Sequence, residues 1–143
     1  MDAKDQKIFN YLVDHGRDKI SDISKELDIP RVTVYERIQG MVRDGVIKKF
    51  TIVPDYKAIG LPVVSFIFVS YSPDGKVTQR QLAEKIAKFP EVEEVYIIAG
   101  QWDMMVKVRS GTIEEVGDFV LDKLRATGGV EKTETVSVFS VVK

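Results

Sequence analysis

A chain of 143 residues, 44% of them hydrophobic, is long enough for one ordinary domain or two small ones with real apolar cores. It has no cysteine and one histidine, which excludes disulfides, thiol catalysis and cysteine-based or histidine-rich metal sites. The formal charge of −1 argues weakly against nucleic acid as a partner, but its distribution along the chain matters more than the total. No apolar run approaches the roughly 20 residues of a membrane span, and residues 1–5 lack a signal-peptide profile, so we expect a cytoplasmic protein without a membrane partner.

Two helical patterns precede residue 30. The first helix is predicted from Asp2 to about His15. A shorter run follows Ser21, whose hydroxyl is expected to cap the free N–H groups of the first turn. The apolar faces of the two helices are predicted to be Ile8, Phe9, Leu12 and Val13, and Ile20, Ile23 and Leu27.

A third helix is predicted to begin near Pro30, because proline is tolerated in a first helical turn. Residues 31–49 carry five basic and two acidic side chains, and the short helix before the turn favours DNA binding over a merely solvated surface. In the major groove arginine can fork onto guanine and threonine can reach either base type. The predicted core stripe is Val34, Ile38, Met41 and Val42, and the predicted DNA contacts are Ser21, Arg31, Val32, Thr33, Tyr35, Glu36 and Arg37, with Arg31, Thr33 and Arg37 leading.

A turn at Asp44-Gly45 is followed by a predicted strand over residues 46–52, which fits the wing of a winged helix-turn-helix. Lys48 and Lys49 on this wing would contact backbone phosphates and add affinity without sequence choice. Prolines and glycine then interrupt the periodicity. We therefore predict a DNA-binding domain over residues 1–52 and a linker over 53–61.

Residues 62–143 are predicted to form a second domain with the order βαββαβ. Two helices with one apolar face each, beside four strands, are best accommodated by an antiparallel sheet with both helices on one side, so the fold class is α+β and ferredoxin-like. The predicted strands are 63–71, 92–99, 104–109 and 130–142, the predicted helices are 78–89 and 112–125, and the apolar face of the second helix is Ile113, Val116, Val120, Leu121 and Leu124.

The strand at Val63–Val69 is nearly continuous in apolar residues, which indicates burial on both faces. The sheet face opposite the helices then needs a cover, so a homodimer through that face is expected. The alternative is an ordinary small domain whose exposed apolar residues are scattered.

With a winged helix-turn-helix, a short linker and a βαββαβ domain, the whole chain resembles the Lrp/AsnC family of feast/famine transcription regulators. Three motifs carry the resemblance: residues 24–38, the Asp44–Ile47 turn and Gly100-Gln101-Trp102-Asp103. The resemblance implies double-stranded DNA as a partner, dimers that assemble into a higher oligomer such as an octamer, and an amino-acid effector bound between dimers. It does not transfer a DNA sequence preference, because bulky Tyr35 and acidic Glu36 depart from the small polar or basic residues common in the family.

By this resemblance the effector loop is Gly100, Gln101, Trp102 and Asp103, and the final strand supplies a wall with Thr133, Glu134 and Thr135. Glycine permits close backbone approach, exposed N–H groups could hold a carboxylate, and Asp103 could pair with an ammonium group. The competing interpretation is a plain β-hairpin turn in which Trp102 packs at a subunit contact.

The sequence therefore predicts a transcription regulator, with an architectural DNA-wrapping protein that has no small-molecule effector as the alternative. An enzyme is not expected, since no nucleophile is matched with a base and no phosphate-binding glycine loop or metal set is present. We expect no catalytic residue, no metal and no cofactor.

Overall fold

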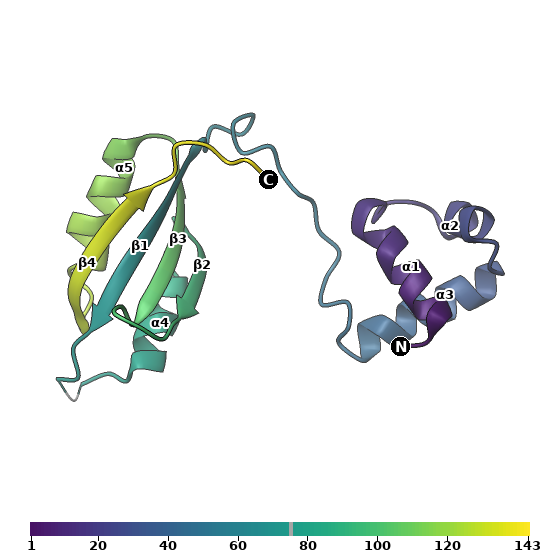
Figure 1. Cartoon of the computed structure of the whole chain (residues 1–143), viewed down its shortest axis with the longest axis horizontal. Helices are drawn as coiled ribbons and strands as arrows, with labels where there is room; N and C mark the ends of the chain where they lie inside the picture. Colours follow the sequence, from purple (N-terminus) through teal and green to yellow (C-terminus); the bar gives the residue numbers. More distant parts are fainter. Residues whose placement is uncertain (75) are drawn as a thin grey trace. The chain divides into compact units, whose positions relative to one another are not determined.

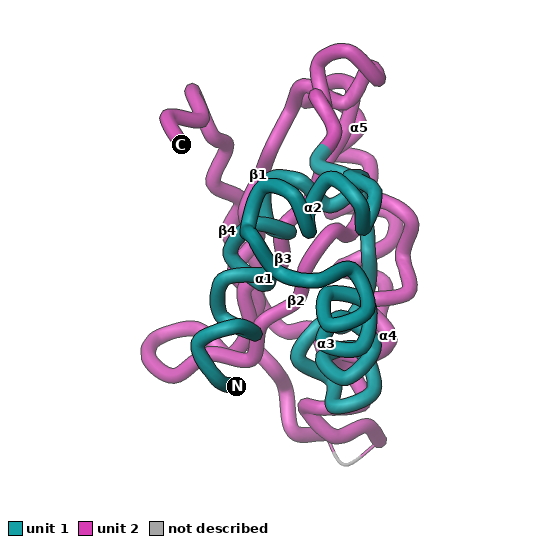
Figure 2. Tube along the Cα trace, turned by 90° about the vertical axis from the view of Figure 1, so that its right-hand side faces the viewer, with its two compact units in different colours: residues 1–53 teal, residues 54–143 magenta. Residues whose placement is uncertain are grey.

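The computed structural model of the chain describes residues 1–74 and 76–143, which form two compact units, 1–53 and 54–143 (Figure 2). The first unit holds α1 (Ala3–Asp14), α2 (Ile20–Leu27) and α3 (Arg31–Arg43). Their contacts bury one apolar cluster, contributed by all three helices and by the turn between α2 and α3. Its buried members are Ile8, Ile23, Ile29, Val34, Ile38 and Met41.

The three helices begin for different local reasons. Asp2 caps α1 by accepting the backbone N–H groups of Lys4 and Asp5, and the Asp5 side chain accepts the Asp2 N–H in return. Pro30 precedes α3, as predicted. The predicted Ser21 cap is wrong, because α2 starts after Lys19 and Ser21 lies inside the first turn. The start of α2 is therefore stabilised by its acidic first turn, which suits the helix dipole, and by burial of its apolar face, rather than by a side-chain cap.

The predicted wing strand is also wrong in this chain. Residues 46–52 follow α3 in an extended path without strand pairing, and no segment in the described part of the first unit lies in register to pair with them. A lone extended segment has no ladder of hydrogen bonds to form. The Ile47 N–H instead donates to the Met41 carbonyl at 3.0 Å and closes the end of α3, and Ile52 is 81% exposed.

The second unit is a four-stranded antiparallel sheet in the order β2-β3-β1-β4, with α4 (Gln79–Ala87) and α5 (Ile113–Asp118) on one face (Figure 1). The strands are β1 (Val63–Tyr71), β2 (Val92–Ile97), β3 (Met104–Ser110) and β4 (Val130–Ser137). The predicted ferredoxin-like fold is confirmed. The core lies between sheet and helices, where alternate residues of β1 and β3 pack against α4, α5 and the segment that continues α5.

Several predicted details differ. The second helix is not one α-helix: α5 passes into a π-helical segment, η1 (Phe119–Leu124). The predicted strands at 92–99 and 130–142 end earlier, at Ile97 and Ser137. Four side chains predicted to face a core are exposed because the apolar stripes are narrower than periodicity suggested. They are Val13, Val42, Ile113 and Leu121.

Candidate functional site

A tight turn sets α3 against α2. Asp28 adopts a left-handed conformation with φ 52°, which a short polar side chain tolerates better than most. The Ile29 N–H donates to the Ser24 carbonyl at 3.1 Å, and the Ser24 hydroxyl donates to the Ile29 carbonyl at 2.6 Å. With Ile29 buried in the core, these bonds fix the turn of a helix-turn-helix.

The side of α3 away from this core is open to solvent. Arg31 and Glu36 are exposed, and two apolar side chains, Val32 and Tyr35, are 68% and 52% exposed. Thr33 is half-buried. Exposed valine and tyrosine side chains can contact thymine methyl groups and sugars. This face is the candidate nucleic-acid interface.

Sequence reasoning missed Gln39, which is exposed and extends this face by one turn beyond Tyr35 and Glu36. A glutamine amide can bond both hydrogen-bonding atoms of adenine in the major groove. The spacing of four from Tyr35 was the available signal. Gln39 therefore joins the candidate interface.

Arg37 lies differently from its prediction. Its guanidinium Nη1 is 2.5 Å from Asp2 Oδ2 and 3.2 Å from Asp5 Oδ1, and its side chain is only 35% exposed. The Asp5 backbone N–H and the Arg37 guanidinium hold the pKa of Asp2 below its usual value. In this structure the Arg37 charge joins α3 to the start of α1, and its role as a DNA contact stays a prediction.

Lys48 and Lys49 are exposed, but on the unpaired extended segment rather than on a wing strand. Ser21 is half-buried within α2. The structure thus keeps both lysines available for phosphates, and it places Ser21 on a different helix from the exposed face of α3.

The glycine loop sits between β2 and β3. Gly100 has φ 130°, a conformation that strains other residues, and Gln101 is exposed. Asp103 is tied into the fold: its Oδ2 accepts the Tyr71 backbone N–H at 2.7 Å, and its own N–H donates to the Val69 carbonyl at 3.0 Å. That carboxylate positions the loop against β1, and its predicted pairing with an effector ammonium group stays a prediction.

Trp102 is half-buried and packs against Phe68, with the ring centroids 6.1 Å apart and an angle of 37° between the ring planes. In the register of β4 with β1, Phe68 pairs with Glu134, so Glu134 shares the open sheet face with Phe68. Thr133 and Thr135 pair with Val69 and Ile67 and point to the helix side. Of the three β4 residues predicted to bind the effector, only Glu134 therefore lies on the sheet face where Trp102 packs. The Thr133 hydroxyl instead accepts a hydrogen bond from Arg125 Nε at 3.1 Å.

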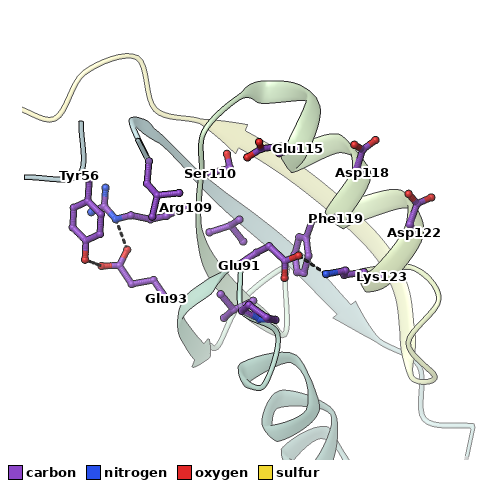
Figure 3. Close-up of a pocket in the computed structure, with 14 residues that line it drawn as sticks. Tyr56, Glu91, Glu93, Arg109, Ser110, Glu115, Asp118, Phe119, Asp122 and Lys123 are labelled. Atoms are coloured by element: carbon purple, nitrogen blue, oxygen red, sulfur yellow. Dashed lines mark hydrogen bonds and ion pairs between the residues drawn. The ribbon is translucent and has the colours of Figure 1, made fainter. Parts of the chain in front are cut away.

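At the end of the sheet where β2 begins and β3 ends lies a cleft of about 560 Å³ that the sequence did not predict (Figure 3). Its floor is apolar, and its walls come from the start of β2, the end of β3, α5 and η1, and the segment before β1. The lining residues are Tyr56, Leu61, Pro90, Glu91, Val92, Glu93, Val108, Arg109, Ser110, Glu115, Asp118, Phe119, Asp122 and Lys123.

Within the described residues, no group of three or more histidine, aspartate or glutamate side chains is arranged to hold a metal ion. No helix among those same residues has the length and apolar character required to cross a bilayer.

A helix-turn-helix followed by a ferredoxin-like sheet, with an exposed recognition face on α3, defines a DNA-binding transcription regulator. Two family models match the chain: the Lrp/AsnC ligand binding domain over residues 64–143, and the sugar-specific transcriptional regulator TrmB over residues 2–59. An uncharacterised HTH-type transcriptional regulator of Pyrococcus abyssi is 48% identical over all of this chain and 95% of that protein. The chain belongs to the Lrp/AsnC family, as its motifs predicted.

Solved structures agree on the fold. A transcriptional regulator of Neisseria meningitidis in complex with L-methionine has a TM-score of 0.92 at 22% identity, covering 100% of this chain and 92% of that chain. AsnC of Escherichia coli has a TM-score of 0.87 at 22% identity, covering 100% and 95%. The family consists of transcriptional regulators, so the prediction that the chain acts on transcription is confirmed.

Proposed function

We propose that this Lrp/AsnC regulator binds double-stranded DNA sequence-specifically through α3. The observation that carries the proposal is the exposed face of α3, where Arg31, Tyr35 and Gln39 stand on a helix held from behind by a buried core. The flanking lysines, Lys48 and Lys49, add positive charge for phosphates. Arg31 and Gln39 supply the forked donors that read guanine and adenine.

We further propose a homodimer formed through the open face of the sheet. Both α4 and α5 lie on the other face, and the open face presents Phe66 and Phe68 from β1 with exposed Tyr96 and Val136 beside them. An exposed patch rich in aromatic side chains is typical of a protein–protein interface rather than of a sheet face that contacts only water. Higher assembly, to an octamer or a related ring, is proposed to place the Gly100–Trp102 loops at the contacts between dimers.

An amino acid is the proposed effector at that loop. Gly100 has no side chain, so a ligand can approach the backbone there closely. The structurally similar regulator from Neisseria meningitidis was solved with L-methionine. Because Asp103 is used within the fold, the proposed ammonium partner is Glu134, whose side chain is exposed on the same sheet face as Trp102. Binding would shift assembly or DNA affinity by its preference for one state over the other.

DNase footprinting on the chain's own upstream DNA, with a scrambled duplex of equal length, tests the DNA half. A bounded footprint that survives competitor DNA supports a sequence-specific regulator. Protection that spreads over both duplexes and is lost steeply with salt would replace this proposal with the architectural, DNA-wrapping role. Calorimetric titration with each of the twenty amino acids tests the effector half, and no heat from any of them would overturn it.

A further inference from the structure

The segment that precedes β1 is folded into a turn of its own. Asp55 Oδ1 accepts the backbone N–H groups of Lys57 and Ala58 at 3.0 and 3.3 Å. The Leu61 N–H donates to the Tyr56 carbonyl at 2.8 Å and closes the turn. The stretch of prolines and glycine before the second domain therefore has a defined backbone path.

Tyr56 fastens this turn to β2 and β3 (Figure 3). The Arg109 guanidinium lies 3.5 Å from the centre of the Tyr56 ring, and the Tyr56 hydroxyl donates to Glu93 Oε1 at 3.1 Å. Glu93 Oε2 in turn accepts Arg109 Nε at 2.7 Å, and the two charged side chains are only 26% and 16% exposed. A cation over an aromatic face is attracted more strongly where water is partly excluded. The three side chains therefore form a closed set that holds the turn on the sheet.

The backbone of the turn also lies directly against the end of β3. A Cβ at Gly111 would be 3.2 Å from the Gly60 carbonyl oxygen, which is closer than side chains usually approach. Gly60 itself has φ 79°, a conformation that strains other residues. The turn is thus seated by a backbone contact in addition to the Tyr56 side chain.

The six residues before this turn, 48–53, are all exposed. Within the described residues, their backbone N–H groups donate to no other segment. Ile47, whose N–H donates to the Met41 carbonyl at 3.0 Å, ends the anchored part of the first unit. We call residues 48–53 the tether. Fully extended, it spans at most about 20 Å.

We propose that Tyr56 is a positioning residue for DNA binding, because it holds residues 54–61 on the second unit and so keeps the tether short. This inference rests on the proposed function, in which the two DNA-binding units of a homodimer engage one duplex. Release of the turn would lengthen the tether to residues 48–61 and extend its reach to about 50 Å.

A longer tether lowers the effective concentration of the second DNA-binding unit once the first has bound. That concentration falls roughly as the −3/2 power of tether length, so growth from residues 48–53 to residues 48–61 lowers it about threefold to fourfold. Tyr56 thus sets DNA affinity without contacting DNA.

Limited trypsin digestion of the full chain without DNA tests the anchor. The tether carries Lys48 and Lys49 and the turn carries Lys57, so mass spectrometry compares both regions in one sample. Initial cleavage after Lys57 should be at least tenfold slower than cleavage in the tether. Tyr56→Ala should accelerate cleavage after Lys57 at least tenfold and leave the tether rate unchanged. Tyr56→Phe keeps the ring beside Arg109 but loses the hydrogen bond, so its rate should be intermediate.

Ile59→Ala is the matched control, because Ile59 belongs to the same turn and its side chain is 58% exposed. Both cleavage rates should stay within twofold of the original chain, and circular dichroism checks that each variant is folded. Cleavage after Lys57 that stays slow in Tyr56→Ala overturns the anchor. Equal acceleration by Ile59→Ala also overturns it, since the turn would then not depend on the Tyr56 contacts.

Gel-shift titration on the chain's own upstream DNA at fixed salt measures the consequence for binding. Tyr56→Ala should weaken the affinity about threefold to fourfold, and Ile59→Ala should not change it. Unchanged affinity in Tyr56→Ala, together with faster cleavage after Lys57, overturns the positioning role. Absence of any shift with the original chain overturns the proposed DNA binding and the positioning role with it, whereas the trypsin rates still decide whether Tyr56 anchors the turn.

Discussion

Arg37 of α3 holds Asp2, the residue that caps α1, with Nη1 and Oδ2 2.5 Å apart. The two residues are 35 positions apart in the sequence, and Asp5 joins the same contact at 3.2 Å. Ion pairs from Arg37 to two aspartates thus connect α3 to the N-terminal end of α1. The orientation of α3 depends on residues outside the helix-turn-helix motif itself.

Replacing Arg37 with alanine should lower the thermal stability of the first unit at neutral pH. The reason is that Asp2 and Asp5 then lose their common cation while their capping bonds remain. Because the folded pKa of Asp2 is depressed, this contribution is complete above the unfolded pKa near 4 and disappears as pH falls through the lower folded pKa. Melting curves of both proteins at pH 7 and in acid measure the difference. A stability gap that persists unchanged in acid would contradict the assignment.

Replacing Gln39 with alanine should weaken specific DNA binding. A bidentate contact to adenine contributes about 1–3 kcal/mol of discrimination, which corresponds to roughly fivefold to 150-fold in affinity. Gel-shift titration at fixed salt gives the affinity, and Gln6→Ala, on the exposed side of α1, is the matched control. If Gln39→Ala and Gln6→Ala bind the operator equally well, Gln39 does not read a base.

Gly129 allows β4 to begin close to the start of α4. It has φ 100°, and a Cβ there would lie 2.9 Å from Val77 Cγ2 and 3.3 Å from a Leu82 methyl group. Gly129→Ala should therefore destabilise the second unit by more than about 1 kcal/mol. The neighbouring Gly128→Ala meets no atom within 4 Å and should change stability little. Chemical denaturation of the two variants compares them, and equal midpoints would refute the steric account.

Trp102 packs on Phe68 at the rim of the open sheet face. Under the proposed assembly, Trp102→Ala should reduce the oligomer mass measured by light scattering while the circular dichroism spectrum is retained. Trp102→Phe keeps an aromatic contact and should retain most of the mass. An unchanged mass with a lower melting temperature would assign Trp102 to packing within one chain.

Periodicity predicted the elements well because each is amphipathic over its own length. The buried face of α3 follows from the spacing of Val34 and Ile38, and β1 from its nearly continuous apolar run around Ile67. The wing prediction failed because residues 46–52 have the composition of a strand, but the described residues of the first unit supply no strand for them to pair with.

The site was predicted less completely, because side-chain partners far apart in the chain decide its chemistry. Arg37 and Asp103 looked available for ligands, yet Asp2 and the Tyr71 backbone N–H engage them. Strand register separates Glu134 from Thr133 and Thr135, which sequence proximity alone had grouped together. The cleft above Phe119 is lined by four separate segments of the chain, so no local sequence pattern predicted it.

We propose that this Lrp/AsnC regulator binds its operator specifically and responds to an amino acid. The most direct measurement is a gel-shift titration on the chain's own upstream DNA at fixed salt with competitor DNA, repeated in the presence of each of the twenty amino acids. We expect a competitor-resistant shift whose affinity or stoichiometry one amino acid changes. A shift that competitor abolishes and that no amino acid alters would rule out both specific binding and the effector response.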